Sequence, residues 1–324
     1  MIDDGPATAR TAAPSPALLA DLAVRALGEE ARLSPKPGLV DRRGGGAHDD
    51  MDLPLLLASA EALRRTFRAV AEAARRTPAG VELREEVGRL GRAGERAMLR
   101  ATRGVNTHRG ALWALGLLVA GAACARDERE AARRAAGLAA LPDRLAPAAL
   151  SHGERVRRLH RVRGARGEAE AAFPHVVEVA LPRLRRARAA GLTGEAARLD
   201  ALLEVMSLLD DTCLLHRGGP EGLSTVRRGA GRVLAEGGAG TARGLAALLG
   251  LDRLLRERRL SPGGSGDLLA AALFLDTVPW PGRRCHAEPE VLTCRRWSTS
   301  SPPTGPPGGG RTSGSSDRAT WRSW

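Results

Sequence analysis

The apolar residues of this chain recur at helical spacing, and that pattern restricts the fold more than any other feature. Leu18, Leu19, Leu22, Val24 and Leu27 show it near the start of the chain. Alanine, leucine and valine supply most apolar positions, and aromatic residues make up only 2% of the chain. Alanine and leucine are strong helix formers, whereas sheets favour β-branched and aromatic side chains. We therefore expect an all-α fold.

Five polar, glycine-containing loops divide the helical pattern, at residues 34–52, 102–110, 151–167, 210–221 and 261–267. The pattern predicts helices at residues 17–32, 53–76, 82–100, 111–125, 127–140, 195–209, 222–235, 241–258 and 268–276, and one more that ends near residue 190. The run 111–125 is the longest apolar one, so we expect its helix to be the most buried. Asn106 or Thr107 suits its N-cap, and Asp49 or Asp50 suits the N-cap of the helix after the first loop.

The composition changes at both ends of this helical region. Residues 1–16 contain Pro6, Pro14 and Pro16 and are predicted to be a disordered lead-in. Residues 17–276 are predicted to form a single multi-helix globular domain, and a chain with 43% hydrophobic residues can bury its core. Residues 277–324 mix Ser, Pro, Gly and Arg without an apolar period. We expect this tail to be disordered, and a shifted reading frame would explain it.

The formal charge of +13 favours an anionic partner. Nucleic acid is not expected, because aromatic stacking residues are scarce and no binding motif is present. The longest apolar run, 111–125, is shorter than the roughly 20 residues that span a bilayer, so no membrane segment is expected. The acidic N-terminus differs from a signal peptide. We therefore expect a cytoplasmic protein.

The five loops concentrate cations beside predicted helix starts. Lys36 is the only lysine in the chain, and Arg109 with His108 opens the apolar helix. Cations in a first turn oppose the helix dipole at a cost of about 0.3–1 kcal/mol, and a bound anion would reverse that sign. Helix N-termini preceded by glycine also bind phosphate through free N–H groups. We expect a nucleotide site formed by these loops; the alternative for Arg109 is a side chain that turns into solvent.

Carboxylates lie in the same loops and could hold Mg²⁺ or act as a general base. They are Asp49, Asp50, Asp52, Glu168, Asp210 and Asp211. For each acid alone, a capping or surface role is the alternative. The chain has no G-x-x-x-x-G-K-[ST], G-x-S-x-G or H-E-x-x-H motif, which argues against the common nucleotide and hydrolase sites.

Several long motifs carry a family resemblance. They are Pro35-Lys36-Pro37-Gly38-Leu39-Val40-Asp41, Gly46-Ala47-His48 with Asp50-Met51, Gly104-Val105-Asn106-Thr107-His108-Arg109-Gly110, Ser151-His152-Gly153, Gly164-Ala165-Arg166-Gly167-Glu168-Ala169 and Ser261-Pro262-Gly263-Gly264-Ser265. In this order, over residues 18–276, they resemble the triphosphoribosyl-dephospho-coenzyme A synthase family. The stretch Asp210-Asp211-Thr212-Cys213-Leu214-Leu215-His216-Arg217-Gly218-Gly219 resembles the malonate decarboxylase branch more than the citrate lyase branch.

The resemblance implies a transferase that joins ATP to 3′-dephospho-CoA and releases adenine. Its product is the precursor of the prosthetic group of an acyl carrier protein, and it would pass to an acyl carrier protein phosphoribosyl-dephospho-CoA transferase. The chain departs from the family pattern at Ala172, where glycine usually precedes Phe173, and at Gly266, where alanine usually precedes Asp267.

This reaction suggests roles for the loop residues. We expect Lys36, Arg109, Arg166 and Arg217 to hold the triphosphate. Asp50 and Asp211 are expected to bind Mg²⁺ or act as the base, and His48 or His108 to orient a phosphate or protonate the leaving adenine. The remaining candidates are Glu168 as a catalytic acid and Gly45, Gly46, Asn106, Thr107, Gly218 and Ser265 as substrate-binding residues.

Two other functions use parts of the same pattern. A magnesium-dependent helical nucleotide hydrolase would need the acids and the phosphate loops, but only water as acceptor. A basic nucleic-acid binder would use the arginines without the carboxylates. Incubation with ATP and dephospho-CoA separates these possibilities, because only the transferase yields both adenine and a joined product.

Overall fold

The computed structural model describes residues 13–146 and 152–281. Within these ranges the chain is helical, and the only β pairing is an isolated bridge between Asp41 and Gly44. The helices are α1 (Pro16–Arg32), α2 (Leu53–Ala62), α3 (Arg64–Arg76), α4 (Val81–Ala101), α5 (Arg109–Ala122), α6 (Glu128–Ala140), α7 (His152–His160), α8 (Gly164–Glu170), the π-helix η1 (His175–Ala180), α9 (Leu181–Ala189), α10 (Gly194–Leu208), α11 (Thr212–Ala235), α12 (Ala242–Glu257) and α13 (Gly263–Thr277). The all-α prediction is confirmed.

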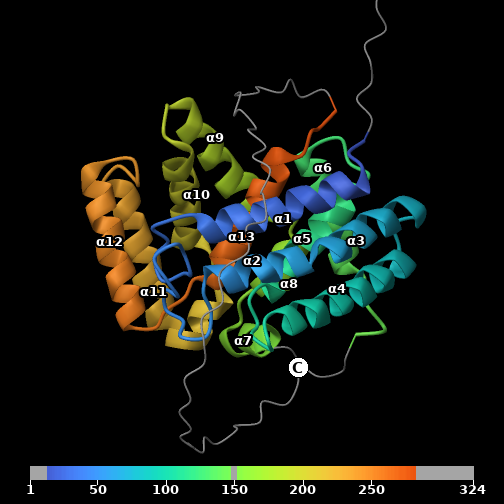
Figure 1. Cartoon of the computed structure of the whole chain (residues 1–324), viewed down its shortest axis with the longest axis horizontal. Coiled ribbons are helices and arrows are strands. Elements are labelled where there is room, and N and C mark those ends of the chain that lie inside the picture. Colours follow the sequence, from blue (N-terminus) through green and yellow to red (C-terminus); the bar gives the residue numbers. More distant parts are fainter. Residues whose placement is uncertain (1–12, 147–151, 282–324) are drawn as a thin grey trace, which may run out of the picture. The chain divides into compact units, whose positions relative to one another are not determined.

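Two apolar helices, α5 and α13, form the centre of the helical unit, and α1 packs across both (Figure 1). Every residue from Ala114 to Ala122 is buried, as is every residue from Leu268 to Leu275. The run predicted to be the most buried is therefore a core helix. Other helices surround this pair: α3, α4 and α6 pack on α5, while α10 and η1 pack on α13. No helix in the described ranges is both long and apolar enough to cross a membrane.

Side-chain caps set several helix starts, although not always at the predicted residue. Asp52, rather than Asp49 or Asp50, caps α2 by accepting the Leu55 N–H at 2.9 Å. Helix α5 starts one residue after His108, and Asn106 Oδ1 accepts the Arg109 N–H at 3.3 Å. The predicted helix 53–76 is interrupted at Leu63, where α2 ends and α3 begins.

Four of the five predicted loops contain helix, and one of these is 102–110, whose last two residues belong to α5. Residues 152–160 and 164–170 form α7 and α8, Thr212 begins α11, and Gly263 begins α13. Helix α11 bends at Gly219, whose φ of 60° and ψ of −163° break it one residue before Pro220. Glycine lowers helix propensity, but packing against neighbouring helices offsets that cost. Arg166, Glu168, Arg217 and Ser265 therefore lie on helices and not in loops. Residue 151 lies outside the described ranges.

The helical unit extends past the predicted end at residue 276. Val278 and Trp280 are 2% and 3% exposed, and the Trp280 indole donates to the Leu275 carbonyl at 3.0 Å. A buried tryptophan with a satisfied N–H belongs to the core, so the described domain continues to residue 281. Residues 1–12 of the predicted lead-in and 282–324 of the predicted tail lie outside the described residues.

Ala172 adopts a backbone conformation that favours glycine. Its φ is 61°, and Phe173 follows at 55°. A left-handed conformation costs a non-glycine residue about 1–2 kcal/mol, and the greater entropy of glycine in the unfolded chain offsets part of that cost. We expect Ala172→Gly to raise the free energy of unfolding by about 0.5–1 kcal/mol. Urea denaturation measures it. Ala171→Gly, at a negative φ of −85°, is the control and is expected to destabilise; a loss of stability in Ala172→Gly would contradict the prediction.

Candidate active site

Residues 33–52 form a loop that is fixed by two buried carboxylates. Asp41 accepts hydrogen bonds from the Lys36 N–H at 2.9 Å, the Ser34 hydroxyl at 3.0 Å and the Arg43 side chain at 2.7 Å. Burial opposes ionisation of Asp41, but the bonds from Arg43 and Lys36 outweigh it and lower the pKa of this carboxyl. Asp252 of α12 accepts the Gly38 N–H at 3.0 Å. The loop is therefore held against α12 in one conformation.

Lys36 lies inside the protein and not at the surface. Its side chain is 1% exposed, and Nζ donates to Glu30 Oε1 of α1 at 2.6 Å. Glu30 is itself buried, with 8% of its surface exposed. Two opposite charges at this distance compensate each other's loss of hydration. The lysine predicted to hold phosphate is therefore half of a buried ion pair in this structure.

A hydrogen-bonded chain links α2 to the start of α5. The Thr107 hydroxyl donates to Ser59 Oγ at 2.6 Å, and Ser59 Oγ lies 2.7 Å from His108 Nδ1. Ser59 is fully buried and His108 is 4% exposed. Among the described residues, His108 Nε2 has no hydrogen-bond partner. Desolvation, followed by the charge of Lys36, lowers the pKa of His108 to about 3, so its ring is neutral near pH 7.

The buried His108 is expected to make stability depend on pH. Its folded pKa of about 3 lies below the ordinary 6.5. Between these values the unfolded chain binds a proton that the folded protein does not, so stability falls as the pH drops below about 6.5. The expected contribution at pH 5 is a loss of about 2 kcal/mol. Urea denaturation at pH 8 and pH 5 gives the decline in the free energy of unfolding. We expect this decline to be smaller by about 2 kcal/mol in His108→Asn than in wild type. Equal declines in the two proteins would contradict the prediction.

Asp211 joins the start of α11 to the start of α13. Oδ1 accepts the Cys213 N–H at 2.9 Å, and Oδ2 accepts the N–H of Ser265 at 2.9 Å and its hydroxyl at 3.1 Å. The residue is 2% exposed. Desolvation raises the pKa of Asp211 although these bonds act in the opposite direction. A Cβ at Gly264 would lie 3.1 Å from this carboxylate, so glycine leaves room for the close approach.

Asp267, in the first turns of α13, faces the start of α5 and accepts the Ala111 N–H. It keeps some accessible surface, yet desolvation and the charges of Asp211 and Glu30 raise its pKa well above the usual value. The space beside Gly266 is small, since a Cβ there would lie 3.1 Å from Glu30 Oε1. Three carboxyls thus meet between α1, α11 and α13, and burial among them favours the protonated form of Asp267.

A second group lies nearer the surface and contains His48 and Arg217. The Arg217 guanidinium donates to His48 Nδ1 at 3.1 Å, and His48 Nε2 lies 2.8 Å from the Ser261 hydroxyl. Because Nδ1 accepts from arginine, Nε2 carries the proton and donates to Ser261. Desolvation and then the charge of Arg217 lower the pKa of His48. Asp50 is exposed and has an oxygen 3.7 Å from His48 Nδ1.

Glycines shape the turn that presents His48. Gly46 has φ of 63°, and a Cβ there would lie 2.3 Å from the Leu39 carbonyl oxygen. At Gly45 a Cβ would lie 2.4 Å from the His48 carbonyl oxygen. Gly218 packs against Leu260, whose side chain would be 2.5 Å from an added Cβ. At these three predicted binding residues, glycine allows close packing against its backbone.

The other predicted residues lie outside both groups. Arg109, the first residue of α5, forms an ion pair with Glu95 of α4. Arg166 is exposed on α8 and pairs with Glu170 at 2.7 Å. Glu168 is buried and accepts the His175 N–H at 2.9 Å and its ring N–H at 2.8 Å. Glu168 therefore fixes the start of η1.

The described residues contain no group of three or more His, Cys, Asp and Glu side chains arranged to hold a metal ion. Asp211 directs both oxygens to protein donors, and Asp50 lies at the surface beside His48. This donor set does not fit a resident magnesium ion, which prefers several free oxygen ligands.

The sequence patterns did not identify every residue that shapes the site. Those missed are Glu30, Ser59 and Asp267, together with Asp41 and Asp252, which hold the loop. Glu30, Ser59 and Asp252 lie within helical segments, where a polar residue gives no signal of burial. Asp41 lies inside one of the quoted motifs and Asp267 lies two residues after another. Their position near these motifs was the available signal of a role in the site.

Comparison with known proteins agrees with these motifs. The family model described as ATP:dephospho-CoA triphosphoribosyl transferase matches residues 16–285. A 2-(5''-triphosphoribosyl)-3'-dephosphocoenzyme-A synthase of Klebsiella pneumoniae is 52% identical over 263 residues, 80% of this chain and 94% of the relative. A probable enzyme of the same name from Azotobacter vinelandii is 55% identical over 273 residues, 82% of this chain and 94% of the relative.

A third relative, from Pseudomonas aeruginosa strain UCBPP-PA14, carries the same probable name and is 55% identical over 265 residues, 81% of this chain and 90% of the relative. No solved structure matches the chain. The family model covers the loop of residues 33–52, the starts of α5, α11 and α13, and the residues of α8. This chain therefore belongs to the ATP:dephospho-CoA triphosphoribosyl transferase family.

Proposed function

We propose that this chain transfers the triphosphoribosyl group of ATP to the ribose 2′-hydroxyl of 3′-dephospho-CoA. The bond between the ATP ribose C1′ and adenine breaks, and a bond from C1′ to the acceptor oxygen forms. The hydroxyl loses a proton and adenine leaves with one. The family match over residues 16–285 is the observation that carries this proposal. It does not favour the nucleotide hydrolase that the acids and loops also suggested.

Arg217 and His48 are the groups that we assign to the triphosphate of ATP. They lie at the start of α11 and in the loop of residues 33–52, with Ser261 beside them. A guanidinium can form paired hydrogen bonds to phosphate oxygens. The pKa of His48 is lowered, so this ring binds as a neutral donor. Mg²⁺ belongs to the proposal as the counter-ion of ATP, and we derive no step from a resident metal.

Asp267 is our candidate for the proton that the leaving adenine takes. The two candidate histidines, His48 and His108, have lowered pKa values, whereas the pKa of Asp267 is raised. A carboxylic acid with a raised pKa keeps its proton to higher pH, which suits general acid catalysis, and that contributes about 100- to 10,000-fold. We expect Asp267→Asn to lower kcat by about that factor and leave the KM for ATP nearly unchanged, because asparagine can still accept the Ala111 N–H. A kcat within threefold of wild type would contradict the assignment.

The reaction itself is tested with the purified full chain. ATP and 3′-dephospho-CoA are incubated together, and mass spectrometry follows adenine and the joined product. Both should appear in equal amounts, and neither should appear when one substrate is omitted. Adenine or phosphate release from ATP alone would indicate the hydrolase instead.

We further propose that the product serves the malonate decarboxylase branch and passes to the acyl carrier protein phosphoribosyl-dephospho-CoA transferase in the cytoplasm. The stretch 210–219 supports the branch, and the chemistry of the product, an activated triphosphate, supports transfer to a carrier protein. The purified transferase and the decarboxylase carrier protein test this proposal. No labelling of the carrier protein by the isolated product would reject it.

A further inference from the structure

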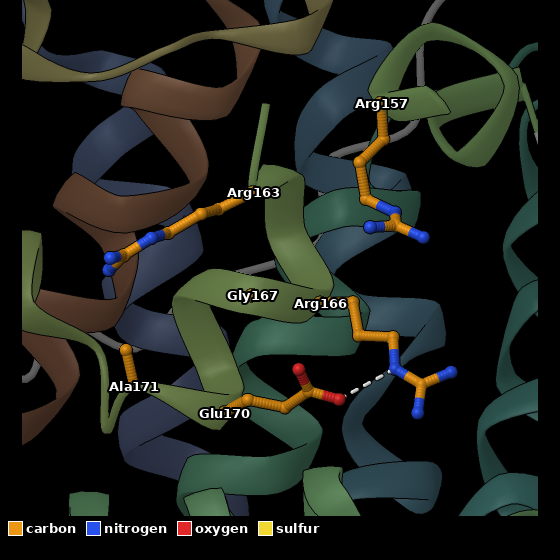
Figure 2. A pocket seen from close by; sticks show the side chains of 6 residues that line it. All are labelled: Arg157, Arg163, Arg166, Gly167, Glu170 and Ala171. Atoms are coloured by element: carbon orange, nitrogen blue, oxygen red, sulfur yellow. Dashed lines mark hydrogen bonds and ion pairs between the residues drawn. The ribbon is translucent and has the colours of Figure 1, made fainter. Parts of the chain in front are cut away.

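The surface between α7 and α8 contains a basic hollow that the groups described above do not use. Figure 2 shows its lining, which comprises Arg157, Arg163, Arg166, Gly167, Glu170 and Ala171, around a cavity of about 540 Å³. A second cavity of about 430 Å³ shares Arg157 and Arg163 and is further lined by Arg158, Arg161 and Val162. We call the two cavities together the α7–α8 hollow. Each of the two cavities has a volume in the range of small-molecule sites.

The α7–α8 hollow has more positive than negative charge. Arg157 and Arg158 share Glu154, at 2.7 and 3.1 Å, and Arg166 pairs with Glu170. The structure records no ion pair for Arg161 or Arg163 with any described residue. Five arginines are thus opposed by two acids. In Figure 2 the Arg157 and Arg166 side chains extend to one side of α8 and Arg163 to the other, so cations flank this helix.

Another arginine, Arg84 of α4, lies near Arg166 and forms an ion pair with Asp143 at 3.4 Å. Arg84 of α4 is buried, and its pKa is lowered by desolvation and then by the charges of Arg166 and Arg92, against the effect of Asp143. Its guanidinium lies 5.4 Å from the centre of the Trp113 ring. The Trp113 indole donates to the Ala165 carbonyl of α8 at 3.2 Å. A bound polyanion would reduce the remaining repulsion between Arg84 and Arg166.

The α7–α8 hollow adjoins the active site. Gly164, the first residue of α8, lies between the two, since a Cβ there would lie 3.4 Å from Arg157 Cγ of the hollow and 3.5 Å from Thr212 Cγ2. Thr212 begins α11 and follows Asp211 directly. An anion in the hollow can therefore be part of a substrate that also reaches the reacting groups.

We propose, resting on the proposed function, that the α7–α8 hollow binds the diphosphate of the acceptor, 3′-dephospho-CoA. Both substrates are polyanions and occupy the site together, so each needs its own cations to offset their repulsion. Arg217 and His48 serve ATP, and Arg157 and Arg166, which extend to the same side of α8, serve the acceptor. From the sequence, Arg166 was expected to hold the triphosphate of ATP, whereas this proposal assigns it to 3′-dephospho-CoA.

The pantetheine arm is a reason to assign the α7–α8 hollow to 3′-dephospho-CoA and not to ATP. This arm takes no part in the reaction and has to leave the site, which suits a hollow on the surface. Leu159 of α7 is 77% exposed and lies between Arg158 and the partly buried Val162 in the chain. In this proposal Leu159 is the apolar contact for the arm. ATP has no comparable apolar extension.

The test compares Arg166→Gln and the double variant Arg157→Gln with Arg166→Gln against Arg133→Gln, which changes an exposed arginine of α6. We expect the KM for 3′-dephospho-CoA to rise about 10-fold in the single variant and 100-fold in the double variant, as for the loss of one and two charge-assisted contacts. The KM for ATP should stay within twofold, and the α6 control should match wild type. Thermal denaturation checks that all variants fold.

Two results would overturn the assignment. One is a higher KM for ATP with an unchanged KM for the acceptor, which would place the triphosphate in the hollow. The other is no change in either constant. Titration calorimetry with 3′-dephospho-CoA measures binding without turnover and should show the same 10- and 100-fold losses. If wild type binds 3′-dephospho-CoA but forms no joined product, and the variants lose this binding, the proposed function is rejected and the acceptor site is retained.

Discussion

Lys36→Met is expected to destabilise this protein by about 3–5 kcal/mol, because it leaves the carboxylate of Glu30 buried without a partner. Lys36 is 1% exposed and its Nζ lies 2.6 Å from Glu30 Oε1. Methionine fills most of the lysine volume, so the loss reports the unpaired charge more than a cavity. Urea denaturation at pH 7.5 measures the free energy of unfolding.

The double variant Lys36→Met with Glu30→Leu is the matched control. It removes both charges, so its stability should return to within about 1–2 kcal/mol of wild type. Its activity then separates the two roles of Lys36. If the lysine only balances Glu30, the stable double variant keeps its KM for ATP; if it also contacts phosphate, that KM rises. A single variant as stable as wild type would show that the ion pair is not buried in solution.

Arg217→Gln is expected to lower kcat/KM for ATP about 100- to 1,000-fold, the usual effect of removing a fixed donor from a developing or bound anion. The guanidinium donates to His48 Nδ1 at 3.1 Å and projects from the first turns of α11. Its charge lowers the pKa of His48, so the variant should also shift that pKa upward. The acidic limb of the pH–rate profile should therefore move to higher pH.

Two further variants define the specificity of that result. Arg217→Lys keeps the charge but loses the paired donors, and we expect an intermediate loss of about 10-fold. Arg243→Gln removes an exposed arginine from α12, and its kinetics should match wild type. A kcat/KM within threefold of wild type in Arg217→Gln would remove this residue from the triphosphate site.

The sequence predicted the helices well where apolar spacing was regular. The run 111–125 became the core helix α5. It failed at glycine-rich motifs, where α8 and the first turns of α13 are helical although the local propensity is low. In these segments glycine is needed for close packing, as at Gly264 against Asp211, and tertiary contacts outweigh propensity.

The sequence by itself determined the helical class, the family and the set of motif loops, because apolar spacing and long motifs are local properties. Only the tertiary structure decided what each charged residue faces. Lys36 was expected to contact phosphate, and the structure pairs it with Glu30 of α1. Arg166 was expected beside Arg217, and the structure places it in the α7–α8 hollow. Burial, charge pairing and pKa depend on residues distant in the chain, so no single motif contains that information.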